Sequence, residues 1–351
     1  MATCPLCNKA GKNECRKNWR TTMYRKSWVS RAAVALTGLC LVAGLSAPAA
    51  AADRIFFGIA TGSTGGVYYP LGGMIAQVIS NNAEVGGARV IATAETGNAS
   101  VANARLLQEG SIEAGMMGAD IADQAYRGTA QFDDGAVANL RAIGALFPET
   151  VQIVVRADSD IKGFEDLKGK TVSSGPAGSG MYQLFGDVLG AFDMTRADVS
   201  EDFSSFSQAV DKLRDGNIDA FFAIGGLPTV SIQDLASSHK VRLLALTDEE
   251  IAKVRESQPY YATTVVPAGT YDGQDEAVKT LALRALLITH DAIADDVVYE
   301  VAKAIYENSE TLSKVHVQGK NVALETALES ISIPLHPGAK RYFEEKGLAV
   351  E

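Results

Sequence analysis

Hydroxyl side chains and glycines are concentrated in one stretch of the chain, which reads FGIATGSTGGVYYPLGG over 57–73. We predict a strand over 54–60, then a turn, then a helix that begins near Pro70, because proline is tolerated at the first helical position. Hydroxyl groups and the free N–H groups of a helix start can bind an anionic or hydroxyl-rich small molecule. A tight turn that needs glycine only for its backbone angles is the alternative interpretation. The hydroxyls and tyrosines around the turn favour a ligand site, whose candidate residues are Thr61, Gly62, Ser63, Thr64, Gly65 and Tyr68.

Residues that commonly perform catalysis or bind metals form no known motif in this chain. Ser63 and Ser179 both lack the glycine two positions earlier that a G-x-S-x-G nucleophile elbow requires. The four histidines are scattered without metal-ligand spacing, and no lysine follows Gly66 as a phosphate-binding Walker loop requires. The glycines at 58, 62 and 65 also differ in spacing from the dinucleotide-binding pattern G-x-G-x-x-G. We therefore predict a binding protein and not an enzyme, with no metal and no cofactor.

Polar turns also follow the next two predicted strands, 89–96 and 112–117. The first of these turns contains Asn98 and Ser100, and the second ends at Asp120. Strands that alternate with helices predict a parallel sheet, and the loops after its strands gather at one edge, where ligands bind. We therefore expect these turns to converge with the first one. Asp120 would suit a ligand amine or hydroxyl, and capping of its own helix is an equally good interpretation.

A second α/β unit is expected over 151–261. A strand over 171–174 leads into a small-residue loop, 175–180, that opens a helix, and a further strand ends at 224. Two such units, each with a glycine-rich loop at a strand end, predict an α/β fold of two lobes with a hinged ligand cleft. The first lobe is expected to comprise 53–150 and 262–351. The second lobe offers Gly178, Ser179, Gly180, Met181 and Gly225 as ligand contacts.

The first 52 residues predict a leader. Basic residues at 25, 26 and 31 precede the apolar run Ala32–Leu45, and small residues at 47–52 follow it. This pattern is typical of a signal peptide over 23–52 that is cleaved near Ala52. The segment before Met23 contains three cysteines that resemble half of a zinc ribbon, too few ligands for a zinc site. Because all four cysteines precede Asp53, the processed chain would contain none and would form no disulfide.

The charge balance bears on the partners of the processed chain. The whole sequence has 32 basic and 42 acidic residues, and the leader accounts for eight and one of these. The remaining 24 basic and 41 acidic residues give a formal net charge of −17. Such an acidic surface repels nucleic acid, so we expect no nucleic-acid partner. An anionic ligand would have to be held by local hydrogen-bond donors.

Six segments of the chain, taken in order, form a recognisable set. They lie at 61–73, 166–170, 175–180, 218–222, 267–271 and 336–339, and the first is the most specific. Together they resemble the TAXI-type receptors of the tripartite ATP-independent periplasmic (TRAP) transporters. The resemblance implies two α/β lobes of the type II periplasmic-binding class, which close on a ligand and deliver it to an integral membrane permease driven by an ion gradient. It also implies that the ligand is a small organic acid or an acidic amino acid, such as glutamate or 2-oxoglutarate.

Two positions differ from the usual pattern of these receptors. Gly118-Ala119-Asp120 stands where relatives carry Gln-Ser-Asp, and Met181 stands where a threonine is common. Both changes remove polar groups from the expected cleft and favour a different or less polar ligand.

The sequence thus predicts a monomeric periplasmic receptor that binds a small carboxylate or amino acid and serves a TRAP permease. An exported sensor that docks a signalling protein is one alternative. An enzyme on the same scaffold is another, because a fold does not fix its function. Such an enzyme would need Asp120 or a tyrosine as its general base.

Overall fold

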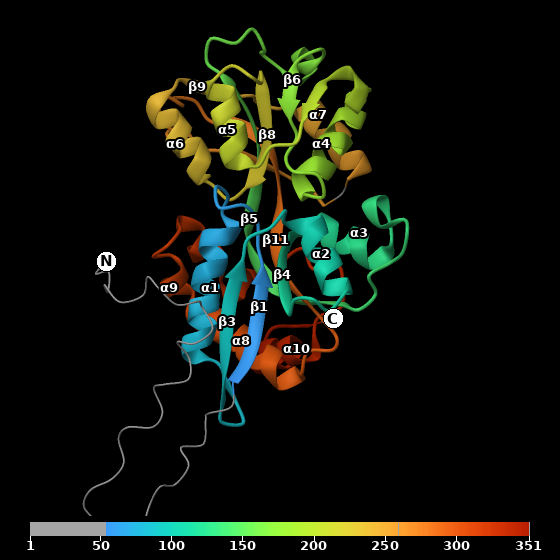
Figure 1. Ribbon diagram of the computed structural model, residues 1–351, viewed down its shortest axis with the longest axis vertical. Coiled ribbons are helices and arrows are strands. Elements are labelled where there is room, and N and C mark those ends of the chain that lie inside the picture. Colours follow the sequence, from blue (N-terminus) through green and yellow to red (C-terminus); the bar gives the residue numbers. More distant parts are fainter. Residues whose placement is uncertain (1–53, 259, 351) are drawn as a thin grey trace, which may run out of the picture. The chain divides into compact units, whose positions relative to one another are not determined.

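The computed structural model describes residues 54–258 and 260–350 of the chain (Figure 1). These described residues form one compact unit. The predicted signal peptide, its cleavage position and all four cysteines lie outside the described residues. Within those residues, no helix combines the length and apolar character needed to span a bilayer.

The first lobe is built on the strands that the sequence predicts near its start. Strand β1 pairs in parallel with β3 on one side and with β4 on the other. A helix follows each of these strands, as the alternating pattern of the sequence predicts. The elements are β1 (Arg54–Ala60), α1 (Tyr68–Asn82), β2 (Glu84–Val85), β3 (Ala88–Glu95), α2 (Ser100–Gln108), β4 (Ala114–Gly118) and α3 (Ala119–Arg127).

Two long antiparallel strands, β5 (Leu140–Arg156) and β11 (Val278–His290), pass through both lobes (Figure 1). They join all strands into one mixed sheet with the order β2-β3-β1-β4-β11-β5-β8-β6-β7, while β10 pairs with β11 and β9 with β5. The two apolar runs on either side of Pro148 are therefore parts of the single strand β5. The pairing of β5 with β11 shifts register near Arg284, where the chain passes from one lobe to the other.

The second lobe repeats the α/β arrangement around parallel strands β6, β7 and β8. Helices α6 and α7 are additions to what the sequence patterns predict. The elements are β6 (Thr171–Ser173), α4 (Gly180–Ala191), β7 (Ser200–Asp202), α5 (Phe206–Arg214), β8 (Ala220–Gly225), α6 (Val230–Ser238), β9 (Val241–Leu243), α7 (Asp248–Ser257) and β10 (Ala262–Val266).

The last part of the chain covers the first lobe. Helix α8 packs against α1 and α10, and Tyr342 and Phe343 of α10 are buried in the same apolar cluster as Phe147. The buried His336 caps α10, because its side chain accepts a hydrogen bond from the N–H of Gly338. The helices are α8 (Asp295–Glu307), α9 (Ser309–Leu312) and α10 (Pro337–Glu345).

The apolar clusters show where the chain returns to the first lobe. The sequence analysis places this return at residue 262. In the structure, β10 pairs with β11, and Val266 is buried with second-lobe residues such as Phe221. Leu283 belongs to a second-lobe cluster, whereas Ala285 belongs to a first-lobe cluster. We therefore propose that residues 262–283 belong to the second lobe and that the return lies within β11.

Candidate ligand-binding site

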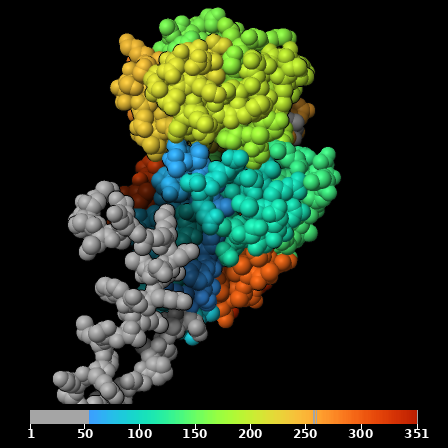
Figure 2. All heavy atoms as spheres, viewed as in Figure 1, coloured from blue at the N-terminus to red at the C-terminus, as the bar shows by residue number. Residues whose placement is uncertain are grey.

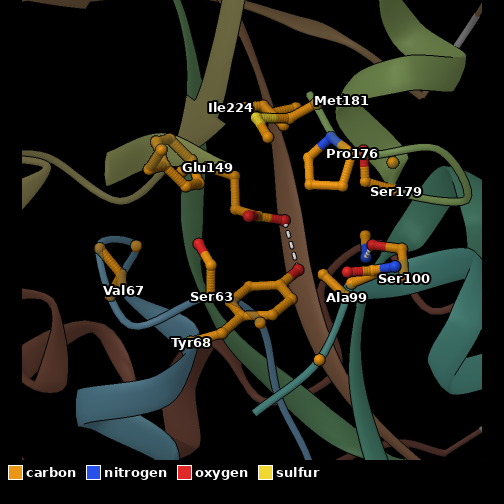
Figure 3. Close-up of a pocket in the computed structure, with 18 of the residues that line it drawn as sticks. Ser63, Val67, Tyr68, Ala99, Ser100, Glu149, Pro176, Ser179, Met181 and Ile224 are labelled. Carbon is orange, nitrogen blue, oxygen red and sulfur yellow. Dashed lines mark hydrogen bonds between the residues drawn. The ribbon is translucent and has the colours of Figure 1, made fainter. Parts of the chain in front are cut away.

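A pocket lies between the two lobes, at the ends of β1, β4 and β8 and beside the middle of β5 and β11 (Figure 3). About 610 Å³ of space, the open mouth included, lies between its atoms. Its lining residues are Gly62, Ser63, Gly66, Val67, Tyr68, Gly97, Asn98, Ala99, Ser100, Gly118, Asp120, Glu149, Pro176, Ser179, Gly180, Met181, Phe206, Ile224, Gly225 and Leu283.

The three polar turns of the first lobe and the glycine-rich loop of the second lobe all reach this pocket. Parallel strands place their following loops at one edge of the sheet, and this geometry brings together residues far apart in sequence. The residues expected from the sequence that line the pocket are Gly62, Ser63, Tyr68, Asn98, Ser100, Asp120, Ser179, Gly180, Met181 and Gly225.

Four expected residues do not line the pocket. The hydroxyl of Thr61 is buried and donates to the backbone carbonyl of Glu95 at 2.6 Å, so it ties β1 to β3. Thr64 is exposed outside the pocket. The carbonyl groups of Gly65 and Gly178 accept hydrogen bonds from the opposite lobe, which gives these two glycines a role in holding the lobes together.

Three helices begin at the pocket wall. The first N–H groups of a helix have no partner within it, and they attract negative charge. Helices α1 and α2 have Val67 and Ala99 at their N-caps, and neither side chain caps the helix. Ala99 has φ 60° and ψ −150°, a conformation that residues other than glycine rarely adopt. At α4 the hydroxyl of Ser179 accepts from the N–H of Tyr182 at 3.1 Å and leaves the first N–H groups uncapped.

Glu149 is the ionisable residue of this pocket that the sequence analysis missed. It lies in the middle of β5, its side chain is 4% exposed, and its Oε2 accepts a hydrogen bond from the Tyr68 hydroxyl at 2.8 Å (Figure 3). Burial raises the pKa of Glu149, the bond from Tyr68 opposes the shift and the nearby Asp120 adds to it, so that the pKa is about 8. The sequence signal that could have identified Glu149 is an acidic residue placed between two apolar runs.

Asp120 has a similar environment in the same pocket. It is 3% exposed, and its Oδ2 accepts a hydrogen bond from the buried hydroxyl of Tyr261 at 2.7 Å. Burial raises the pKa of Asp120, whereas the Tyr261 hydroxyl and the backbone N–H groups of Ile121 and Asp120 lower it. The same burial raises the pKa values of Tyr68 and Tyr261, so both phenols remain neutral donors.

The pocket has two carboxyl groups and no basic partner for them. None of its lining residues is lysine, arginine or histidine. Across the described residues, no group of three or more histidine, cysteine, aspartate and glutamate side chains is placed to bind a metal ion. A buried carboxylate without a cation is energetically unfavourable, which fits the raised pKa values of Asp120 and Glu149.

Direct hydrogen bonds hold the lobes together in this structure. The Ser231 hydroxyl of α6 donates to the carbonyl of Gly65 at 2.8 Å, and the N–H of Ala102 donates to the carbonyl of Gly178 at 3.2 Å. In the space-filling view, the blue segment of the first lobe is in contact with the yellow atoms of the second lobe (Figure 2). The two lobes are thus in direct contact beside the pocket.

The arrangement of two α/β lobes joined by β5 and β11 is the two-lobed fold of periplasmic binding proteins, as the sequence predicts. The chain belongs to the NMT1-like family, which it matches over residues 59–347. A solved structure from Bordetella bronchiseptica RB50 is similar to it, with a TM-score of 0.52 and 14% identity over 84% of this chain and 98% of that one. The periplasmic aliphatic sulphonate binding protein SsuA from Escherichia coli gives a TM-score of 0.48 and 16% identity over 83% and 78%.

Proposed function

We propose that this chain is a periplasmic solute-binding receptor that captures a small organic acid or an amino acid and delivers it to a TRAP-type membrane permease. The observation that carries the proposal is the pocket between the lobes, at which the first turns of α1, α2 and α4 meet. Membership of the NMT1-like family and the two-lobed fold support a receptor. The six sequence segments described above support the TRAP type.

A ligand carboxylate would bind at the helix starts. The uncapped N–H groups of α1 and α2 provide donors without a formal charge, and the Ser63 hydroxyl lies beside them in the pocket wall (Figure 3). This arrangement lets an acidic protein hold an anionic group without a lysine or arginine in the pocket.

Asp120, which an enzyme on this scaffold would need as a general base, accepts hydrogen bonds from Tyr261 and from two backbone N–H groups, which hold it in place. Bending of β5 and β11 would open the lobes to admit a ligand and close them around it, in the manner of hinged binding proteins.

Ligand screening tests the receptor proposal. The exported protein, freed of bound ligand by unfolding and refolding, is melted in the presence of organic acids and amino acids. A ligand present at about 1,000 times its Kd stabilises the folded state by about 4 kcal/mol and raises the melting temperature by several degrees. The proposal fails if no acid or amino acid changes the melting temperature.

Transport assays test the permease type. Membrane vesicles that contain the candidate permease are supplied with the receptor and its labelled ligand. Uptake that follows an imposed ion gradient without ATP is the expected result. Uptake that requires ATP would contradict the TRAP assignment and leave the receptor function intact.

A further inference from the structure

The carboxyl group of Glu149 offers an acceptor that the protein itself does not use. Its Oε2 is bound by Tyr68, but no described residue donates a hydrogen bond to its Oε1. The side chain is buried yet lines the pocket, and it reaches from β5 toward the centre of the space between the lobes (Figure 3). Because Glu149 lines the pocket, a hydrogen-bond donor of a ligand could reach this oxygen.

The charged and titratable groups that face Glu149 are Tyr68 of α1, Asp120 of α3 and Tyr261, which precedes β10. None of them can carry a positive charge. The two carboxyl groups therefore disfavour each other's ionised form, and a cation from outside the protein would relieve this cost. A ligand with two carboxylates would instead bring one of its negative charges close to this pair.

We propose that Asp120 and Glu149 bind an ammonium group of the ligand, while the helix starts bind its carboxylate. This inference rests on the proposed receptor function and narrows its ligand class to amino acids, as opposed to acids that carry no ammonium nitrogen. The pocket offers groups for both charges of a zwitterion: donors at the starts of α1 and α2, and acceptors at the two carboxyl groups.

Binding of an ammonium group would also release a proton. With a pKa of about 8, Glu149 is mostly protonated at pH 7 in the absence of ligand. An adjacent ammonium group favours the carboxylate, so the proton leaves to solvent as the ligand binds. An organic acid held at the same place would favour the protonated carboxyl group and would take up protons.

Paired probes test the inference. The refolded exported protein is titrated calorimetrically at pH 7 with the protein amino acids and with the 2-oxo acid that corresponds to each. Titrations in phosphate and in Tris, which differ in ionisation enthalpy, report the number of protons released. The best amino acid is expected to bind at least about 30-fold more tightly than its 2-oxo acid and to release up to about one proton.

The variant Glu149→Gln removes the acceptor charge and keeps the shape of the side chain. Its preference for the amino acid over the 2-oxo acid should fall by at least about 30-fold, and ligand binding should no longer release a proton. The control Glu84→Gln makes the same change at an exposed position of β2, and it should leave the ligand preference and the proton release unchanged. Two results would overturn this inference and leave the receptor proposal intact: a 2-oxo acid that binds as tightly as its amino acid, or binding that takes up protons. If neither kind of probe binds, the receptor proposal on which it rests is overturned as well.

Discussion

Replacement of Glu149 by glutamine in the ligand-free protein is expected to increase stability, and to do so only at neutral and alkaline pH. Glutamine can still accept the hydrogen bond from Tyr68, and it removes the group whose ionisation in the pocket is unfavourable. A carboxyl pKa raised from 4.5 to about 8 makes the ionised form about 5 kcal/mol less favourable than in the unfolded chain.

The sign of the pH dependence follows from proton counting. Between pH 4.5 and 8 the folded protein keeps the Glu149 proton that the unfolded chain has lost. The free energy of unfolding therefore falls by about 1.4 kcal/mol for each unit of rising pH in this window. Between pH 5 and pH 8 the loss amounts to about 3 to 4 kcal/mol, and the glutamine variant lacks this contribution. At pH 5 the two proteins should have nearly equal stability.

Differential scanning calorimetry of both proteins at pH 5, 6, 7 and 8 measures this difference. For a chain of this size, about 2 °C of melting temperature corresponds to 1 kcal/mol, so the variant should melt about 6–8 °C higher at pH 8. Acidic groups away from the pocket titrate equally in both proteins and cancel in the comparison. A difference in stability that does not change with pH would refute the electrostatic account, and so would a variant that is less stable at every pH.

Three further results are expected. Tyr68→Phe removes the donor to the neighbouring carboxyl group and should cost about 1–3 kcal/mol at pH 8 in thermal melts, whereas the exposed Tyr69→Phe should cost little. Gly65→Ala would place a methyl group on two serine hydroxyls of the second lobe, so calorimetry should show at least about tenfold weaker ligand binding. Gly73→Ala has open space around it and serves as the control; equal affinity of the two variants would contradict closure at this contact. Amino-terminal sequencing of the exported protein should begin at Asp53, and a retained leader would disprove the predicted cleavage.

The sequence predicts those parts of the site that depend on local pattern. The strand, glycine-rich turn and proline-marked helix start around 57–73 are present as β1, its following turn and α1. Convergence of Ser63, Ser100 and Asp120 at one pocket follows from the rule that loops gather at the C-terminal edge of parallel strands. Local residue types are sufficient for these predictions because each feature is encoded within one strand–turn–helix unit.

Features that depend on pairing between distant strands could not be predicted in this way. Thr61 has the residue type of a ligand contact, but the register of β1 with β3 places the carbonyl of Glu95 within reach of its hydroxyl. Glu149 was hidden between two apolar runs, because no local pattern shows that β5 continues past Pro148 beneath the pocket. Tyr261 donates to Asp120 although the two residues are 141 positions apart in the sequence.

The shared sheet has a consequence for how the protein unfolds. Because β5 and β11 each contribute backbone hydrogen bonds to both lobes, neither lobe can lose its strands without breaking the sheet of the other. The lobes can therefore move relative to each other in function and still melt as one cooperative unit. A ligand that touches only the cleft then protects the whole folded chain from unfolding and from proteases that cleave the unfolded state.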